Sequence, residues 1–268
     1  MLLDLDALPQ RGDLPAALPI PPTKMALRAG GQTRKRWRYI GLWGQDAMLC
    51  AARVQVGVAR QRFWALWDGE RLRGKTSMLP IGVEVDGAAT AEPFLLEWHE
   101  DGEPLQVVSR HGDSYIWTRK VPLRATGVIE GKVVEMRGLI DDSAGYHARD
   151  TKWRWCAGVG EAPDGTPLAW NFCEGLHDAP EHSERAVWVG GELTEPGPTT
   201  IAYDLRSTTG PAGETLRAEH VATRAHKTNY GLVASDYEQP FANFSGMLPG
   251  GVEVARGWGV LERHSARW

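Results

Sequence analysis

The chain has 268 residues, a length that suits one large β domain or two small ones. Its 31 glycines and 17 prolines interrupt the sequence throughout, and such frequent interruption argues against helical bundles and coiled coils. The net charge of −4, with lysine and arginine spread along the chain, indicates no nucleic-acid partner, and no stretch approaches the roughly 18 apolar residues of a membrane span. The acidic N-terminus is unlike a signal peptide, so we expect a cytoplasmic protein.

Aromatic residues and cysteines give two further indications. The chain has twelve tryptophans against five phenylalanines and six tyrosines. Because an indole offers a large apolar surface and one N–H that needs a partner when buried, this excess indicates an aromatic-lined cavity. The three cysteines, Cys50, Cys156 and Cys173, include no Cys-x-x-Cys spacing, so we expect them to be reduced and buried, with neither disulfides nor a zinc site.

The pattern along the chain is that of many short strands. Residues 1–30 contain five prolines and no periodicity, which predicts an extended arm on the surface. From Trp37 onward, β-prone runs alternate with turn signals such as Asp68-Gly69; there are about fourteen such runs, a number typical of sandwiches and barrels. Residues 214–230 lack glycine and proline, and their pattern does not decide between helix and strand.

The sequence predicts an all-β protein of two lipocalin-like antiparallel β-barrel halves. No polar linker follows residue 30, and residues 141–145 (Asp-Asp-Ser-Ala-Gly) have the composition of a solvated turn near the middle of the chain. We therefore expect an extended N-terminal arm (1–30), a first half (31–140) and a second half (141–268). An alternative for Asp141-Asp142 is that one of the two carboxyls reaches a cavity mouth as a general acid.

One expected strand, residues 147–155, has polar groups on a face that bears tryptophans. Alternation places these residues on one side: His147, Arg149, Thr151, Trp153 and Trp155. The charged residues between them belong to the solvent side. Polar groups directed inward must be paired or must line a wet cavity.

The last expected strand, residues 258–268, repeats this arrangement. Its tryptophan-bearing face holds Trp258, Glu262, His264 and Trp268. Residues two apart on one strand face lie roughly 7 Å apart, so Glu262 and His264 can act on one substrate. For each histidine the alternative is a core side chain with backbone partners.

The loop at residues 174–182, after the strand that follows residues 147–155, is rich in imidazoles and carboxylates. One interpretation is that Asn171 lines the cavity while Glu174, His177 and Asp178 rim its mouth; the other is a solvated loop. His177 and His182 lack the spacing of a zinc-binding helix, so no metal is expected. The chain also has no nucleophile elbow, phosphate-binding loop or dinucleotide fingerprint, which excludes serine hydrolases, kinases and Rossmann enzymes.

Several motifs resemble those of an uncharacterised bacterial family of domains of unknown function. They lie at residues 145–155, 157–158, 164–165, 169–171, 183–185, 235–241, 244–246, 257–264 and 266–268. The resemblance spans about residues 33–268. This chain departs from the family pattern at Ala242, Cys156 and His177, where the family usually or often has Gly, Ser and Asn, and the last departure argues against a metal or catalytic role for His177.

The Trp-x-Trp strand followed by an Asp-Gly hairpin is also distantly similar to the carotenoid 1,2-hydratase and tocopherol cyclase group. The resemblance implies two lipocalin-like halves and chemistry on an isoprenoid-like double bond, either protonation or addition of water, with aromatic faces stabilising a cation. The acid motif of that group is not reproduced here, so no catalytic residue is transferred.

Two functional hypotheses follow, both with an apolar small molecule as the partner and with no cofactor. The first is a lyase or isomerase in which a proton is transferred by one of three catalytic candidates, His147, Glu262 or His264. The substrate-binding candidates are Tyr146, Arg149, Trp153, Trp155, Asn171, Glu174 and Trp258. The second is a carrier whose polar groups only orient a lipid or terpenoid. A third interpretation is a scaffold whose cavity is filled with side chains.

Overall fold

The computed structural model describes residues 5–12, 14, 18–79, 83–229, 231 and 233–268. Strands make up nearly all of its regular structure, and the one helical element in these ranges is the short 3-10 helix η1 (Leu5–Ala7). The prediction of an all-β protein is therefore confirmed. No helix in the described ranges is long and apolar enough to cross a membrane.

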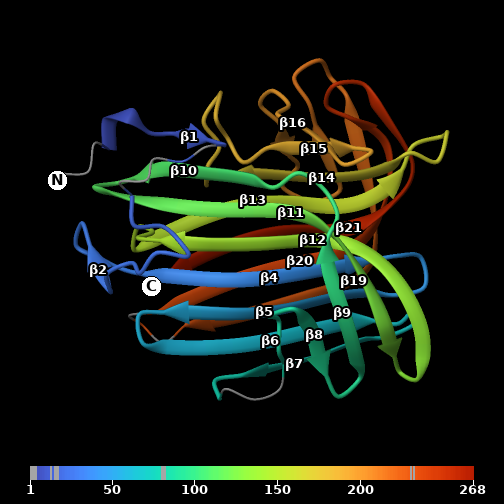
Figure 1. The fold of residues 1–268 in the computed structure, drawn as a ribbon, viewed down its shortest axis with the longest axis horizontal. Coiled ribbons are helices and arrows are strands. Elements are labelled where there is room, and N and C mark those ends of the chain that lie inside the picture. Colours follow the sequence, from blue (N-terminus) through green and yellow to red (C-terminus); the bar gives the residue numbers. More distant parts are fainter. Residues whose placement is uncertain (1–4, 13, 15–17, 80–82, 230, 232) are drawn as a thin grey trace.

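The first half of the chain forms a ten-stranded antiparallel sheet (Figure 1). The central order is β1-β10-β11-β12-β4-β5-β6-β7, and β9 pairs with both β11 and β8. The strands are β1 (Gln10–Arg11), β4 (Lys35–Trp43), β5 (Met48–Val56), β6 (Ala59–Trp67), β7 (Leu72–Ser77), β8 (Ala88–Ala91), β9 (Phe94–Glu100), β10 (Leu105–His111), β11 (Ser114–Ile129) and β12 (Lys132–Gly145). A separate hairpin joins β2 (Arg28–Ala29) to β3 (Gln32–Thr33).

The second half forms a nine-stranded antiparallel sheet in the order β16-β15-β14-β13-β21-β20-β19-β18-β17. Its strands are β13 (Asp150–Glu161), β14 (Pro167–Glu174), β15 (Ala186–Val189), β16 (Glu192–Thr194), β17 (Thr200–Ile201), β18 (Ser207–Thr209), β19 (Thr215–Asn229), β20 (Ala234–Leu248) and β21 (Val252–Arg267). The chain passes from one sheet to the other at residues 146–149.

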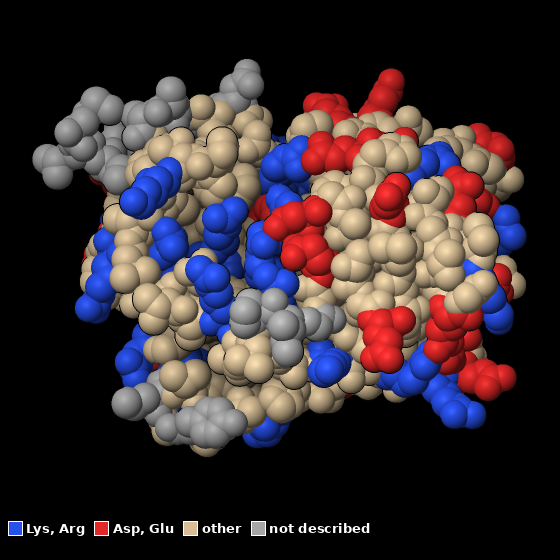
Figure 2. All heavy atoms as spheres, turned by 60° about the horizontal axis from the view of Figure 1, so that its bottom comes forward, with Lys and Arg blue, Asp and Glu red and all other residues tan. Residues whose placement is uncertain are grey.

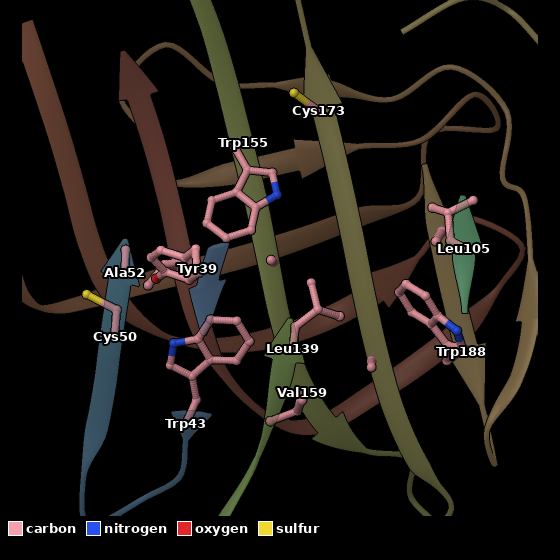
Figure 3. Packing of buried hydrophobic residues seen from close by; sticks show 14 of the residues in the cluster. Tyr39, Trp43, Cys50, Ala52, Leu105, Leu139, Trp155, Val159, Cys173 and Trp188 are labelled. Carbon is pink, nitrogen blue, oxygen red and sulfur yellow. The ribbon is translucent and has the colours of Figure 1, made fainter. Parts of the chain in front are cut away.

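The main core lies between the two sheets. Alternate residues of β4, β5 and β12 face alternate residues of β13, β14 and β21. Figure 3 shows the Trp155 ring directed toward Tyr39 of the other sheet, with Trp43 and Leu139 below them. Because one face of each sheet packs against the other sheet, burial of apolar side chains between them holds the two halves together.

Each sheet also covers a core of its own on its opposite face. In the first sheet the segment that contains β8 and β9 supplies Val83, Val85 and Phe94 to this core, and in the second sheet Ile201 and Leu205 do so. A smaller cluster lies beneath the N-terminal arm. The described part of that arm is anchored because β1 pairs with β10 and because Leu18 and Met25 are buried.

Two local expectations differ from the structure, and a third segment that was left open is a strand. Residues 141–145 are not a turn, because they form the end of β12, where neighbouring strands supply cations to both aspartates. The expected strand 147–155 begins only at Asp150, after the connection between the sheets. Residues 214–230, left open by the sequence, contain β19, which pairs with β18 and β20 and breaks register between His220 and Ala222.

Charged side chains are separated across one face of the molecule. Figure 2 shows aspartate and glutamate gathered over one half of this face, whereas lysine and arginine predominate over the other half and also occur beside the acidic residues. Within the first sheet much of the positive charge is neutralised locally: Arg38 and Arg53 both contact Asp86, and Arg62 lies 3.4 Å from Glu84. These contacts compensate part of the positive charge on β4, β5 and β6.

Candidate functional site

A cavity of about 120 Å³ lies between the two sheets and draws its walls from both. Seven aromatic side chains line it: Trp37, Tyr39, Phe63, Trp153, Trp155, Tyr237 and Trp268. The polar or charged residues that also reach it are Thr118, Lys120, Asp141, Ser143, His177, Glu184, Glu262 and His264. An engineered apolar cavity of about 150 Å³ binds benzene, so this space suits a small ring or a five-carbon branched chain.

Glu262 on β21 is a buried carboxyl with two hydrogen-bond donors. The indole N–H of Trp153 donates to Oε1 at 2.7 Å, and the side-chain amide of Gln239 donates to Oε2 at 2.9 Å. Burial raises the pKa of Glu262 from 4.5 to about 7. The negative charge of Asp141 contributes to the rise, while the two hydrogen bonds and the positive charge of Arg224 oppose it. A large part of the population therefore carries a proton at neutral pH.

His264 follows Glu262 on the same strand face. Its Nε2 shares a 2.8 Å hydrogen bond with the hydroxyl of Ser235, and its ring lies 4.3 Å from the Trp153 ring, centroid to centroid. Burial and the positive charge of Arg224 lower the pKa of His264 to about 4. The imidazole is therefore neutral at physiological pH, with Nδ1 3.9 Å from Glu262 Oε1.

The first sheet contributes an ion pair to the cavity wall. The ammonium of Lys120 on β11 lies 2.6 Å from Oδ1 of Asp141 on β12 and 3.6 Å from Oε2 of Glu184. Burial alone would lower the pKa of Lys120, but the two carboxylates outweigh it and raise that pKa above its ordinary value. A buried ammonium needs such partners, because an unpaired charge in the interior is strongly unfavourable.

Hydrogen bonds fix the orientation of the aromatic walls. The N–H of Trp155 donates to Oδ1 of Asn171 at 2.7 Å, and the Asn171 amide in turn donates to the carbonyl of Glu184 at 2.8 Å. Tyr39 meets the Trp155 ring edge-on at 5.3 Å (Figure 3). Asn171 thus lies behind the wall and positions Trp155.

His147 lies outside the cavity lining. Its ring packs 5.0 Å from that of Trp37, which does line the cavity, and 5.8 Å from that of His111. Burial, followed by His111 and Lys35, lowers the pKa of His147 well below its ordinary value. Neither ring nitrogen has a hydrogen-bond partner among the described residues. His147 is therefore a neutral residue behind the cavity wall.

Four further predicted site residues are also outside the cavity lining. Tyr146 is buried beneath the N-terminal arm, where its hydroxyl donates to the Ala26 carbonyl. Arg149 is exposed on the connection between the sheets, and Trp258 packs against the main core. Glu174 pairs with Arg154 at 3.0 Å and accepts a hydrogen bond from the Ile201 N–H, so it braces the second sheet.

The structure brings Trp153, Trp155, Glu262 and His264 together, and it adds groups that the sequence analysis did not select. Lys120, Tyr39 and Tyr237 lie on strands other than the two whose tryptophan-bearing faces carry polar groups in the sequence, so sequence reasoning missed them. Alternation along β11 would have placed Lys120 on the same face as Ile116, which is buried. A lysine on a strand face that is otherwise buried is the sequence signal that could have identified Lys120 as a site residue.

His177, expected in a rim or a solvated loop, is buried and lines the cavity. Its Nδ1 is 2.8 Å from the Ser109 hydroxyl, and burial together with the charge of Lys120 lowers its pKa well below the ordinary value. His182 is exposed. Within the described ranges, no three His, Cys, Asp or Glu side chains are grouped as metal ligands. All three cysteines are buried and unpaired, as predicted.

Three solved structures show distant likenesses to this chain. A candidate AttH from Nitrosomonas europaea is 10% identical, with 91% of this chain and 97% of that chain covered and a TM-score of 0.45. Kievitone hydratase from Nectria haematococca is 10% identical over 85% of this chain and 88% of that one, at 0.45. CghA in complex with Sch210972 is 11% identical, with 97% of each chain covered, at 0.40. Among curated proteins, none matches the sequence.

The sequence itself matches one family profile, described as a domain of unknown function (DUF2804), over residues 94–268. The matched region begins later than the span of about 33–268 expected from the motifs, and it includes all of the second sheet together with β9 to β12 of the first. Since the profile covers well over half of the chain, the protein belongs to the DUF2804 family.

Proposed function

We propose that the cavity binds a small, largely apolar molecule of lipid or isoprenoid type and that Glu262 protonates it. The reaction is then that of a cofactor-independent lyase or isomerase, such as a hydratase or a cyclase. In this proposal the rings of Trp153 and Trp155 lie beside the reacting carbon. Their faces stabilise positive charge that develops there.

The observation that carries the proposal is the environment of the Glu262 proton. Trp153 and Gln239 are both donors to this carboxyl, so neither accepts its O–H. His264 Nδ1 is the nearest imidazole nitrogen, and at 3.9 Å it is beyond hydrogen-bond distance. The proton is thus available to a molecule in the cavity, and a carboxyl whose pKa is about 7 is well matched to acid catalysis at neutral pH.

The alternative function is a carrier that holds an apolar ligand without changing it. The observation that favours it is that Asp141, Glu262 and His264 already have protein partners, so the polar groups could serve only to orient a ligand. Extraction of the purified protein with organic solvent, followed by mass spectrometry, identifies any bound molecule. Absence of a ligand, together with failure of the five-carbon alcohol 3-methyl-3-buten-1-ol to change tryptophan fluorescence, would contradict both functions.

A deuterium experiment separates the enzyme from the carrier. The protein is incubated in D₂O with 3-methyl-3-buten-1-ol, a five-carbon alkene suited to the cavity, and carbon-bound deuterium is measured by mass spectrometry. Removal of a general acid typically costs 10²–10⁴-fold, so we expect Glu262→Gln to lose deuterium incorporation by about that factor while it retains probe binding. The exposed Glu219→Gln is the control. Binding without incorporation in the natural protein identifies a carrier.

A further inference from the structure

Asp141 and Lys120 form a charged pair on the wall that the first sheet contributes, opposite the strand that carries Glu262. The two residues are direct register partners on β12 and β11, and their side chains are 12% and 4% exposed. Lys120 lies 2.6 Å from Asp141 and 3.6 Å from Glu184. The nearer carboxylate is the principal counterion of the ammonium.

Charge considerations distinguish the three carboxyls of the cavity. Burial raises the pKa of Glu184 even with Lys120 nearby, and burial also raises the pKa of Glu262. Asp141 alone has an ammonium at 2.6 Å, and its second oxygen accepts a 3.4 Å hydrogen bond from the Trp37 N–H. A buried ammonium requires an ionised partner. Asp141 is that partner, so it carries negative charge while Glu262 holds a proton.

Asp141 and Glu262 face the same space from different sheets. Both line the cavity, and the negative charge of Asp141 is among the causes that raise the pKa of Glu262. His264, by contrast, lies beside Glu262 on β21 and therefore on the acid's own side. An acid and a base on opposite walls can act on the two ends of one double bond.

We propose that Asp141 is a second catalytic residue, the base that faces the acid Glu262, and that the substrate is an alkene able to form a tertiary carbocation. This inference rests on the proposed function and specifies its reaction class. That class is the reversible addition of water to a double bond or the movement of the double bond by one position.

The chemistry balances with the alkene alone in isomerisation and with the alkene and one water molecule in hydration. The alkene π pair takes the Glu262 proton to form a C–H bond, which leaves a carboxylate on Glu262 and a cation on the adjacent carbon. In hydration, a water oxygen forms the C–O bond and Asp141 takes the released proton. In isomerisation, Asp141 takes a proton from the carbon next to the cation, and the C–H pair becomes the new double bond. Proton return from Asp141 to Glu262 through solvent completes the cycle.

Infrared spectroscopy tests the charge states without a substrate. The groups facing Asp141 are Lys120, Glu184, His177 and Glu262, so each spectrum is compared with that of a single variant. We expect a protonated-carboxyl band at about pH 5.5, below the midpoint of about 7, that disappears in Glu262→Gln and persists in Asp141→Asn. In Asp141→Asn its titration midpoint should move to lower pH, because a negative charge has been removed. A band lost in Asp141→Asn, or an unchanged midpoint, would overturn the proposal.

Turnover of 3-methyl-3-buten-1-ol in D₂O tests the role itself. We expect Asp141→Asn to lower formation of 3-methyl-1,3-butanediol and 3-methyl-2-buten-1-ol by about 10²-fold or more, and Asp141→Glu to restore part of it. Asp142→Asn is the matched control, because Asp142 pairs with Arg38 on the opposite face of the same strand. Asp141→Asn protein that is folded and turns over like the natural protein would refute the base alone. No product from the natural protein, or full activity in Glu262→Gln, would refute the proposed function.

Discussion

At the scale of single residues, Glu262 links the cavity to the stability of the fold. Its pKa is about 7 in the folded protein and about 4.5 when unfolded. Below about pH 4.5 both states hold the proton. As the pH rises further, the unfolded state releases the proton first. The free energy of unfolding therefore falls up to about pH 7, and above that pH the destabilisation is constant. The shift corresponds to about 3 kcal/mol.

We therefore expect Glu262→Gln to lack this loss. Urea unfolding at about pH 4.5 and about pH 7.5 gives the free energy of unfolding of each protein. The difference between variant and natural protein should grow in the variant's favour by about 3 kcal/mol over this interval, since other titrating groups are common to both. Equal pH dependence in the two proteins would show that Glu262 titrates normally. The exposed Glu219→Gln should leave the curve unchanged.

Trp155 and Trp43 allow the hydrogen bond of a wall indole to be separated from its packing. Both rings are buried in the core between the sheets. The Trp155 N–H donates to Asn171, whereas the Trp43 N–H has no partner among the described residues. Trp155→Phe leaves a buried amide oxygen without its donor, which costs about 1–3 kcal/mol. We expect Trp155→Phe to lower the free energy of unfolding by that much more than Trp43→Phe, as measured by urea titration.

At the scale of elements, the strand that carries Glu262 lies unusually close to its neighbour. A methyl group added at Gly259 on β21 would collide with the backbone carbonyl of Ala157 on β13. Backbone cannot yield as a flexible side chain does, and overpacking typically costs about 1–3 kcal/mol. We expect Gly259→Ala to lower the free energy of unfolding by this amount. Gly44→Ala, where the nearest atom is 3.8 Å away, should be neutral; equal effects would contradict close packing as the cause.

The same elements show what a sequence can reveal about such a site. Alternation placed Trp153, Glu262 and His264 on inward faces because β13 and β21 are regular over those stretches. In a regular strand, every second side chain points to the same face. Alternation failed at His147, which precedes β13, because side chains do not alternate between two faces in an irregular connection.

Asp141 and Asp142 show why the remainder could not be predicted. Two adjacent acids before Ser-Ala-Gly have turn composition, and composition is a local property. Their cations, Lys120 and Arg38, come from other strands of the sheet. Only the pairing of β12 with β11 and β4 makes these residues a stable strand end. The fold class followed from local turn signals, whereas the charged wall of the cavity required the sheet order.

At the scale of the whole molecule, the two sheets should unfold together. Their main core contains residues of both, and the guanidinium of Arg137 on β12 donates to the carbonyls of Gly160 and Leu168 in the second sheet at 2.8 and 2.9 Å. Neither sheet can bury its inner face alone, so loss of one exposes the other. We expect one urea transition, with coincident near- and far-ultraviolet circular dichroism.

Hydrogen bonds to charged groups contribute about 1.5–3 kcal/mol. Arg137→Met should therefore lower the urea midpoint and keep a single transition, whereas the exposed Arg217→Met should not change the midpoint. Two separate transitions in the natural protein would instead identify the halves as independent units, and the cavity between them would then form only by docking.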